Sequence, residues 1–238
     1  MPPRPDRRVP AQAQEISRRL RRWFARHGRD LPWRRTRDPY RILVSELMLQ
    51  QTQVSRVLEF YARFLERFPS LHDLAAARPA AVREQWEGLG YYARARNLHA
   101  LSRRVTRDGD GTLPADPAAL RTLPGIGPYT AGAVASFAFE RPAALVDTNV
   151  ARVIARLFAP HLRPKRARDL TRIWRIAEAI LPRRGPTAWT HNQALMELGA
   201  LVCTARVRHC DVCPVARACL TRQREGPPPA TRPAPRKR

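Results

Sequence analysis

Apolar residues recur at steps of three and four along most of this chain, the spacing that places side chains on one face of an α-helix. Between Tyr40 and Phe68 the series continues through Leu43, Leu47, Val54, Leu58, Tyr61 and Leu65. Glycine and proline punctuate the chain, and no segment shows the alternation typical of a strand. We expect an all-α chain of roughly ten short helices. The other helical stretches are 11–27, 79–86, 91–107, 116–122, 128–138, 148–158, 167–181 and 187–202.

Length and composition exclude several classes of protein. The 238 residues are 44% hydrophobic, enough for one large domain or two lobes around a hydrophobic core. No apolar run reaches the ~18 residues that a membrane span needs, and the N-terminus has no secretory signal. Residues 1–10 and 223–238 are rich in proline and arginine and are expected to be disordered tails. We therefore expect a cytoplasmic protein without a membrane partner.

The chain carries a formal net charge of +24, from 44 basic and 20 acidic residues. Lys165 and Lys237 are its only lysines, so nearly all the basic residues are arginine, a bias that a GC-rich genome also produces. Codon bias selects arginine over lysine, but it does not create an excess of positive charge. A polyanion is the expected partner. Nucleic acid fits better than an anionic membrane surface, because no strongly basic amphipathic helix with an aromatic face is evident.

The four cysteines lie within 17 residues, at Cys203, Cys210, Cys213 and Cys219. Disulfides are not expected in a chain without a secretion signal, so two kinds of metal site compete. Zinc sites usually combine two C-x2-C pairs, whereas this array has one. Uneven short spacings suit four thiolates around one [4Fe-4S] cubane, and the spacing favours that cluster over zinc.

Two segments could contact phosphate groups. A basic loop with Arg206 and Arg208 lies between the first two cysteines, and a rigid metal site would hold it outward, although a merely solvated loop is the alternative. Gly125 and Gly127 lie between two helical stretches, where a tight turn with positive φ and the next helix N-terminus could hold an anion. An ordinary helix connection is the alternative. The flanking residues favour a helix-hairpin-helix, a motif that grips DNA without reading its sequence.

Two carboxylates occupy unusual places. Glu46 has leucine and isoleucine as its helical neighbours, so burial should raise its pKa and keep a proton on it. Asp147 follows an apolar run and stands where a helix begins, and backbone N–H groups there favour the ionised form. The alternatives are a solvent-facing Glu46 and a simple helix cap at Asp147. One protonatable and one ionised carboxylate is the pairing used in acid–base cleavage of glycosidic bonds.

Six further segments, together with the cysteine array, carry a family pattern. They are LPWR (31–34), SELMLQQTQ (45–53), GLGYYARARNL (88–98), LPGIGPYTAG (123–132), VDTNVARV (146–153) and NQALMELG (192–199). With these segments the chain resembles the iron–sulfur helix-hairpin-helix DNA glycosylases, and within them the adenine DNA glycosylases of the MutY type. The resemblance covers about residues 15–222.

This resemblance implies a two-lobed all-α helix-hairpin-helix glycosylase fold. Residues 35–140 would form a six-helix lobe with the hairpin, and residues 11–34 plus 141–222 a lobe with a C-terminal [4Fe-4S] cluster loop held by the four cysteines. The resemblance further implies a monomer, nucleoid-associated and of bacterial type. Its partner would be double-stranded DNA that contains a mismatch or an oxidised base.

The resemblance also implies a role for individual residues. Glu46 matches the general acid of the family, Asp147 the carboxylate near the sugar, and Tyr129 and Asn149 their supporting residues. The remaining matches are Gln51 and Tyr91, which are inserted into the duplex, and Trp33, Arg34 and Glu197, which line the base pocket. The implied reaction releases adenine that is mispaired with 8-oxoguanine or guanine. A monofunctional enzyme is expected, because glycosylase-lyases of the endonuclease III type carry lysine where this chain has Tyr129.

Two departures from the family pattern keep a rival substrate open. Only 19 residues follow Cys219, where family members usually continue into a domain that inspects 8-oxoguanine, so we expect a weaker preference for 8-oxoguanine over guanine. Thr148 follows Asp147 where the family usually has glycine. Both features are typical of thymine (or uracil) glycosylases that act on G·T mismatches, whereas segments 50–52 and 90–94 favour adenine. A non-catalytic iron–sulfur DNA-binding protein is the third hypothesis, and the presence of both carboxylates argues against it.

Overall fold

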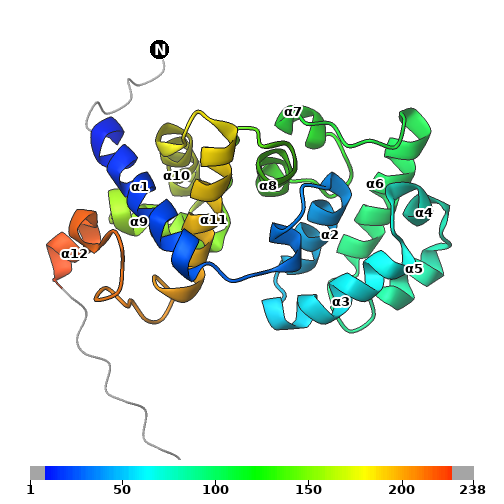
Figure 1. The fold of residues 1–238 in the computed structure, drawn as a ribbon, viewed down its shortest axis with the longest axis horizontal. Helices are drawn as coiled ribbons and strands as arrows, with labels where there is room; N and C mark the ends of the chain where they lie inside the picture. The colour runs from blue at the N-terminus through cyan, green and yellow to red at the C-terminus, as the bar shows by residue number, and fades with distance from the viewer. Residues whose placement is uncertain (1–8, 227–238) are drawn as a thin grey trace, which may run out of the picture. The chain divides into compact units, whose positions relative to one another are not determined.

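The structure is a computed structural model and describes residues 9–226. The predicted tails fall largely outside these residues; of their described ends, residues 9–10 belong to the first helix and residues 223–225 to the last. The described part of the chain is helical and contains no strand, which confirms the all-α prediction (Figure 1). Its helices are α1 (Val9–His27), η1 (Pro32–Arg34), α2 (Pro39–Leu49), α3 (Val54–Arg67), α4 (Leu71–Ala76), α5 (Pro79–Gln85), α6 (Ala93–Asp108), α7 (Pro117–Leu120), α8 (Pro128–Phe139), α9 (Thr148–Phe158), α10 (Ala167–Ile180), α11 (Gly185–Leu201), η2 (Ala216–Ala218) and α12 (Leu220–Glu225).

The chain folds into two compact units. Residues 29–145 and 181–192 form one, which we call the hairpin unit; residues 9–28, 146–180 and 193–226 form the other, the cysteine unit. The long helix α11 contributes its first half to the hairpin unit and its second half to the cysteine unit. The lobes predicted at 35–140 and at 11–34 plus 141–222 stay a prediction. None of the described helices is both long and apolar enough to cross a membrane.

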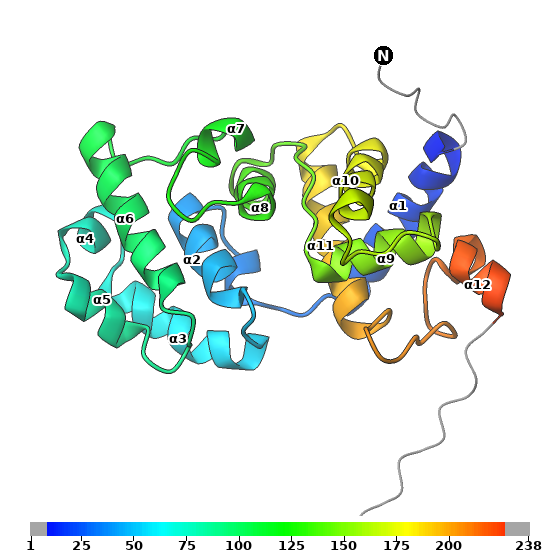
Figure 2. The same cartoon turned by 180° about the vertical axis from the view of Figure 1, so that it is seen from behind.

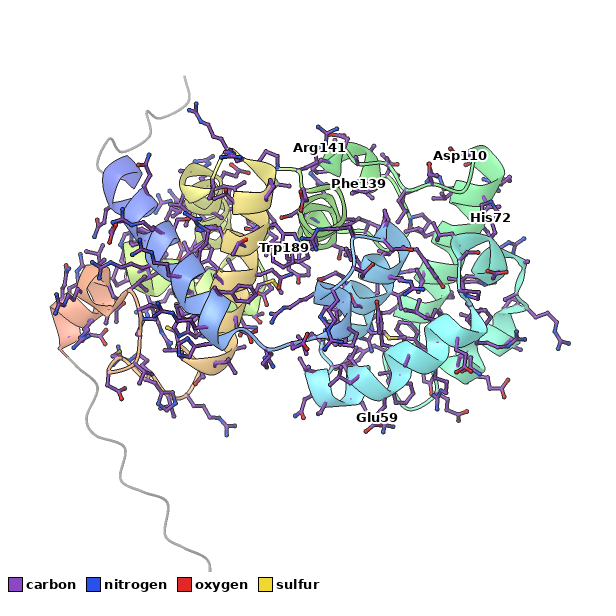
Figure 3. The ribbon with its side chains drawn as sticks, viewed as in Figure 1. Glu59, His72, Asp110, Phe139, Arg141 and Trp189 are labelled. Atoms are coloured by element: carbon purple, nitrogen blue, oxygen red, sulfur yellow. The ribbon has the colours of Figure 1, made fainter. Side chains whose placement is uncertain are left out.

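Aromatic packing dominates the core of the hairpin unit. Phe64 of α3 contacts Phe68 and Trp86 edge-on, with ring centroids 5.1 and 5.7 Å apart, and all three side chains are buried. Helix α2 packs against α3, α6 and α8, so it runs through the middle of this unit (Figure 1). Trp189, which lies on the first half of α11 (Figure 3), packs edge-on against Phe137 of α8. Because the core surrounds α2, the side chains of α2 are held firmly in place.

The helical series that starts at Tyr40 does not run unbroken to Phe68. Helix α2 ends at Leu49 and α3 begins at Val54, and the four residues between them form a turn. Helix α4 was not expected, because six residues are too few to show a period. Ser70 begins α4, since its side chain accepts a hydrogen bond from the backbone N–H of Asp73 at 3.2 Å.

The cysteine unit is built on α9. Helices α10 and α12 pack against α9, and α1 packs against α10 (Figures 1 and 2). Its core is aliphatic, with fully buried Leu20, Val153, Ile154 and Ile173. The amphipathic pattern of α9 places its apolar face in this core. Thr148 and Asn149, at the start of the helix, are not buried.

Candidate active site

Glu46 lies on α2 inside the hairpin unit. Asp38 and Pro39 begin this helix, with the Asp38 side chain accepting from the backbone N–H of Arg41 at 3.0 Å. All residues from Tyr40 to Met48 except the exposed Arg41 are buried, and Glu46 itself is only 3% exposed. The solvent-facing alternative for Glu46 is therefore wrong.

Tyr129 supplies a partner for this carboxyl group. It is the second residue of α8, which packs against α2, and its hydroxyl donates a hydrogen bond to Oε2 of Glu46 at 2.7 Å. Next to this pair, the Gln50 side chain donates to the Thr130 hydroxyl at 3.3 Å. Two residues that the sequence analysis named from segments 83 positions apart are thus in direct contact.

Asp147 is the N-cap of α9 in the cysteine unit, as its position in the sequence predicted. One carboxylate oxygen accepts from the backbone N–H of Val150 at 2.7 Å, and the other accepts from the side-chain amide of Asn149 at 3.1 Å. Burial raises the pKa of Asp147 above its ordinary value, and these N–H groups only partly oppose that rise. The expectation that backbone N–H groups keep the pKa of Asp147 low is therefore wrong, because burial outweighs them.

Asn149 is itself held by a residue that the sequence analysis missed. Arg152, one turn along α9, donates to the Asn149 side-chain oxygen at 2.7 Å, and to the backbone oxygens of Gly199 at 2.7 Å and Cys203 at 2.9 Å. A Cβ atom on Gly199 would lie 2.7 Å from that of Asn149, so only glycine lets α11 approach here. A continuous set of hydrogen bonds therefore joins Asp147 to the backbone of the first cysteine.

The residues predicted to line a base pocket divide between the two units. Trp33 is buried in η1 of the hairpin unit, with its ring edge-on to Tyr61 at 5.3 Å. Arg34 follows it and donates to the backbone oxygen of Arg29 at 2.8 Å. Glu197 lies on the α11 half that belongs to the cysteine unit and is fully buried.

The predicted hairpin connects α7 to α8, and its two glycines differ. Gly125 has φ +76°, and an added Cβ there would come within 2.6 Å of the Asn97 side chain. Gly127 has φ −88°, so the positive φ of the predicted tight turn falls on Gly125. Gly127 is the exposed N-cap of α8, and no atom lies within 4 Å of where its Cβ would be. The space beside it suits a close-lying phosphodiester.

Gln51 and Tyr91 share an unusual backbone conformation. Their φ angles are +57° and +49°, in the left-handed region that non-glycine residues rarely adopt. Both side chains are exposed, and Tyr91 is 58% accessible, which excludes the core-aromatic alternative for Tyr91. Strained and exposed residues of this kind cluster at functional sites.

The four cysteines are free thiols around one cavity of the cysteine unit. Burial raises the pKa of Cys213 to about 12 and also raises that of Cys219. Arg156 of α9 donates to the sulfur and to the backbone oxygen of Cys203, both at 3.3 Å. The segment between the first two cysteines folds back on itself through a bridge between Cys203 and Arg208.

The two arginines of this loop have different surroundings. Arg208 is partly buried and forms an ion pair with Glu225 of α12 at 2.7 Å. Arg206 is exposed at the tip of the loop. Arg206 is thus the better placed of the two for a phosphate contact.

The chain is similar to known proteins of one family. Residues 44–177 match the HhH-GPD superfamily base excision DNA repair protein family. The adenine DNA glycosylase of Rattus norvegicus is 40% identical over 225 residues, which cover 91% of this chain and 43% of that protein. The adenine DNA glycosylase of Mycolicibacterium smegmatis is 46% identical over 196 residues, which cover 82% of this chain and 65% of that protein.

Two solved structures have the same fold. A thermostable thymine-DNA glycosylase is 30% identical with a TM-score of 0.81, and the match covers 90% of this chain and 97% of that one. A trapped endonuclease III–DNA covalent intermediate is 26% identical with a TM-score of 0.75 over the same shares of the two chains. The family match spans more than half of the sequence, and it includes Glu46 in the second half of α2, the hairpin and the Asp147 cap. This chain belongs to the HhH-GPD superfamily of base excision DNA repair proteins.

Proposed function

We propose that this protein is a monofunctional DNA glycosylase that hydrolyses the bond between adenine and deoxyribose where adenine is mispaired with 8-oxoguanine or guanine. The observation that carries the proposal is the buried hydrogen bond between Glu46 and Tyr129. The names of the relatives at 40% and 46% identity support adenine as the released base. The chain spans less than two thirds of the length of these relatives, so the activity is argued from its own residues.

Glu46 is the group suited to protonate the leaving base. Adenine anion is a poor leaving group, and a positioned acid that donates a proton to a ring nitrogen lowers this barrier. The Tyr129 hydroxyl fixes the orientation of the carboxyl group through its 2.7 Å hydrogen bond to Oε2. Since Glu46 is almost fully buried, bulk water does not compete for its proton.

Asp147 is the group suited to stabilise the sugar. As the base departs, deoxyribose gains oxocarbenium character, which an ionised carboxylate stabilises before water attacks C1′. The hydrogen bond from Asn149 and the cap to Val150 fix both oxygens, so the carboxylate needs little reorganisation. Arg152, which holds Asn149, acts as a positioning residue.

Three surface features would bind DNA. The open backbone at Gly127 and the N-terminus of α8 would bind a phosphate, and the exposed Arg206 another. Gln51 and Tyr91 would enter the duplex, because the target base must leave the stack before its glycosidic bond can be reached. A net charge of +24 favours binding to any duplex, so these side chains provide what selectivity there is.

The cysteines fit a [4Fe-4S] cluster better than a single zinc ion. All four line one cavity beside apolar side chains of α9 and α11, and a thiolate as buried as Cys213 requires a compensating positive charge. Four thiolates can each bind one iron of a cubane, whereas zinc sites usually combine two C-x2-C pairs and this array has one. When bound, the cluster would cross-link segment 203–219 to itself beside α9.

Thymine release from G·T mismatches is the second candidate. The thymine-DNA glycosylase structure matches nearly its whole length to this chain at 30% identity. Single-turnover base release at fixed salt separates the candidates, with duplexes that carry adenine opposite 8-oxoguanine, adenine opposite guanine, and thymine opposite guanine. We expect free adenine from the first two duplexes only. Thymine release with adenine untouched would replace the proposal with the second candidate.

A further inference from the structure

Arg94 is a buried cation whose partners are all backbone carbonyls. It lies in the first turn of α6 and is only 7% exposed. Its side chain donates to Leu47 (2.9 Å), Met48 (2.7 Å) and Gln50 (2.6 Å) through Nη1, and to Leu89 (3.1 Å) and Gly90 (2.9 Å) through Nη2, with a longer contact of 3.4 Å from Nε to Tyr91. Two separate segments of the hairpin unit therefore meet on one guanidinium.

Arg94 caps the C-terminus of α2. The last carbonyls of a helix have no partner within the helix, and a cation at that end is also favoured by the helix dipole. Arg94 serves the carbonyls of Leu47 and Met48 in this way. Its shortest bond, 2.6 Å, goes to the carbonyl of Gln50, directly before the left-handed Gln51.

On the other side Arg94 holds the loop before α6. Its Nη2 donates to the carbonyl of Gly90, directly before the left-handed Tyr91, and the indole N–H of Trp86 donates to the same carbonyl at 3.2 Å. The guanidinium carbon also lies 5.4 Å from the centre of the Tyr91 ring. One side chain thus binds the peptide that precedes each of the two strained residues.

A left-handed conformation costs a non-glycine residue roughly 1 kcal/mol or more, so each loop needs contacts that hold it. The exposed side chains of Gln51 and Tyr91 cannot provide them by packing in the core. An arginine fork can, because its planar donors reach two segments at once, whereas a lysine ammonium is a point charge with three donors.

We propose that Arg94 is the positioning residue that holds Gln51 and Tyr91 in register, so that both side chains enter the duplex together. The proposal rests on the proposed function for what the two side chains do. The link between Arg94 and the two loops does not depend on it. Two measurements therefore test separately whether Arg94 holds the two loops and whether base release depends on that hold.

Amide hydrogen exchange of the free protein tests the link. In Arg94→Lys we expect faster exchange in segments 50–53 and 89–92, with α8 unchanged. Arg103 is an exposed arginine on the same helix, so Arg103→Lys is the matched control for Arg94→Lys, and Arg103→Met is the matched control for Arg94→Met. Unchanged exchange in both segments would overturn the proposal whether or not the protein releases a base. Arg94→Met is the stronger variant, and Arg94→Lys decides the matter if Arg94→Met does not fold.

A mutant cycle tests whether base release depends on the positions that Arg94 gives to Gln51 and Tyr91. Misplacing a group by about 1 Å costs up to roughly 10²-fold, so Arg94→Lys should slow single-turnover base release by roughly 10- to 100-fold. If Arg94 acts through Gln51 and Tyr91, the triple variant Arg94→Lys/Gln51→Ala/Tyr91→Ala should be about as slow as Gln51→Ala/Tyr91→Ala alone. A merely structural role gives multiplied losses, and that result would overturn the proposal. If the wild type releases no base, fluorescence of 2-aminopurine beside the mismatch replaces the rate, with unstacking expected in the wild type and lost in Arg94→Lys.

Discussion

Replacing Asp147 by asparagine separates the two roles of this carboxylate. As an N-cap, asparagine is as good as aspartate, so the hydrogen bond from the Val150 N–H survives. The bond from the Asn149 amide at 3.1 Å is lost if the new amide group faces it, at a cost of about 1 kcal/mol. The substitution also removes a charge whose burial is unfavourable. We therefore expect the free energy of unfolding at neutral pH to fall by no more than about 1 kcal/mol.

Catalysis should suffer far more than stability. Loss of a fixed charge that faces a developing cation typically costs ~10²-fold or more, about 2.7 kcal/mol, so single-turnover adenine release by Asp147→Asn should fall at least that far. Asp147→Ser keeps a cap without a carboxylate and should lose as much. Asp38→Asn is the matched control, since Asp38 is the N-cap of α2 and its loss of charge should leave the rate unchanged. A near-wild-type rate for Asp147→Asn would refute the assigned role.

The pH dependence gives an independent check. Burial raises the pKa of Asp147 in the folded protein above its unfolded value, so the folded state prefers the protonated carboxyl group. The wild type should lose stability relative to Asp147→Asn as pH rises from the unfolded value through the raised one. Base release should increase through the same window, because the ionised form is the active one. A wild type that gains stability over Asp147→Asn in this window would contradict the reasoning.

Three other predictions follow from the site. Anaerobically purified protein should contain about four irons per chain with inorganic sulfide, and both should be lost in Cys213→Ser; stoichiometric zinc without sulfide would count against the cluster. Tyr129→Phe removes the 2.7 Å bond to buried Glu46 and should slow base release by roughly 10- to 100-fold, the equivalent of about 1.4–2.7 kcal/mol, whereas an unchanged rate would show that the hydroxyl is dispensable. Borohydride during turnover should trap no strong protein–DNA adduct, because Tyr129 cannot form a Schiff base; efficient trapping with strand nicking would reveal a lyase.

The all-α fold and most helix positions could be predicted from sequence because helical periodicity and glycine or proline breaks are local signals. Short α4 has too few residues to show them. The cap at Asp147 was also predictable, since an aspartate before a helical run is a local signal. The spacing of two glycines does not reveal which one has a positive φ, so only the structure assigns it to Gly125.

The long-range contacts of the site could not be read from the sequence. Motifs named Glu46 and Tyr129 separately, but only the packing of α2 on α8 puts them 2.7 Å apart. Arg94 and Arg152 went unnoticed within quoted segments, because an arginine that donates to backbone carbonyls far along the chain leaves no periodic or compositional trace. The direction of the Asp147 pKa likewise depends on burial by residues distant in sequence.

The central claim is that buried Glu46 protonates adenine for hydrolysis, and one measurement tests it most directly. Free adenine is quantified by chromatography after a single turnover on a duplex with adenine opposite 8-oxoguanine, for the wild type, Glu46→Gln and the exposed control Glu66→Gln. We predict full release by the wild type and the control, and release at least ~10²-fold slower by Glu46→Gln. Duplex affinity should stay unchanged because phosphate contacts dominate it. Wild-type release by Glu46→Gln, or no adenine from the wild type, would contradict the account.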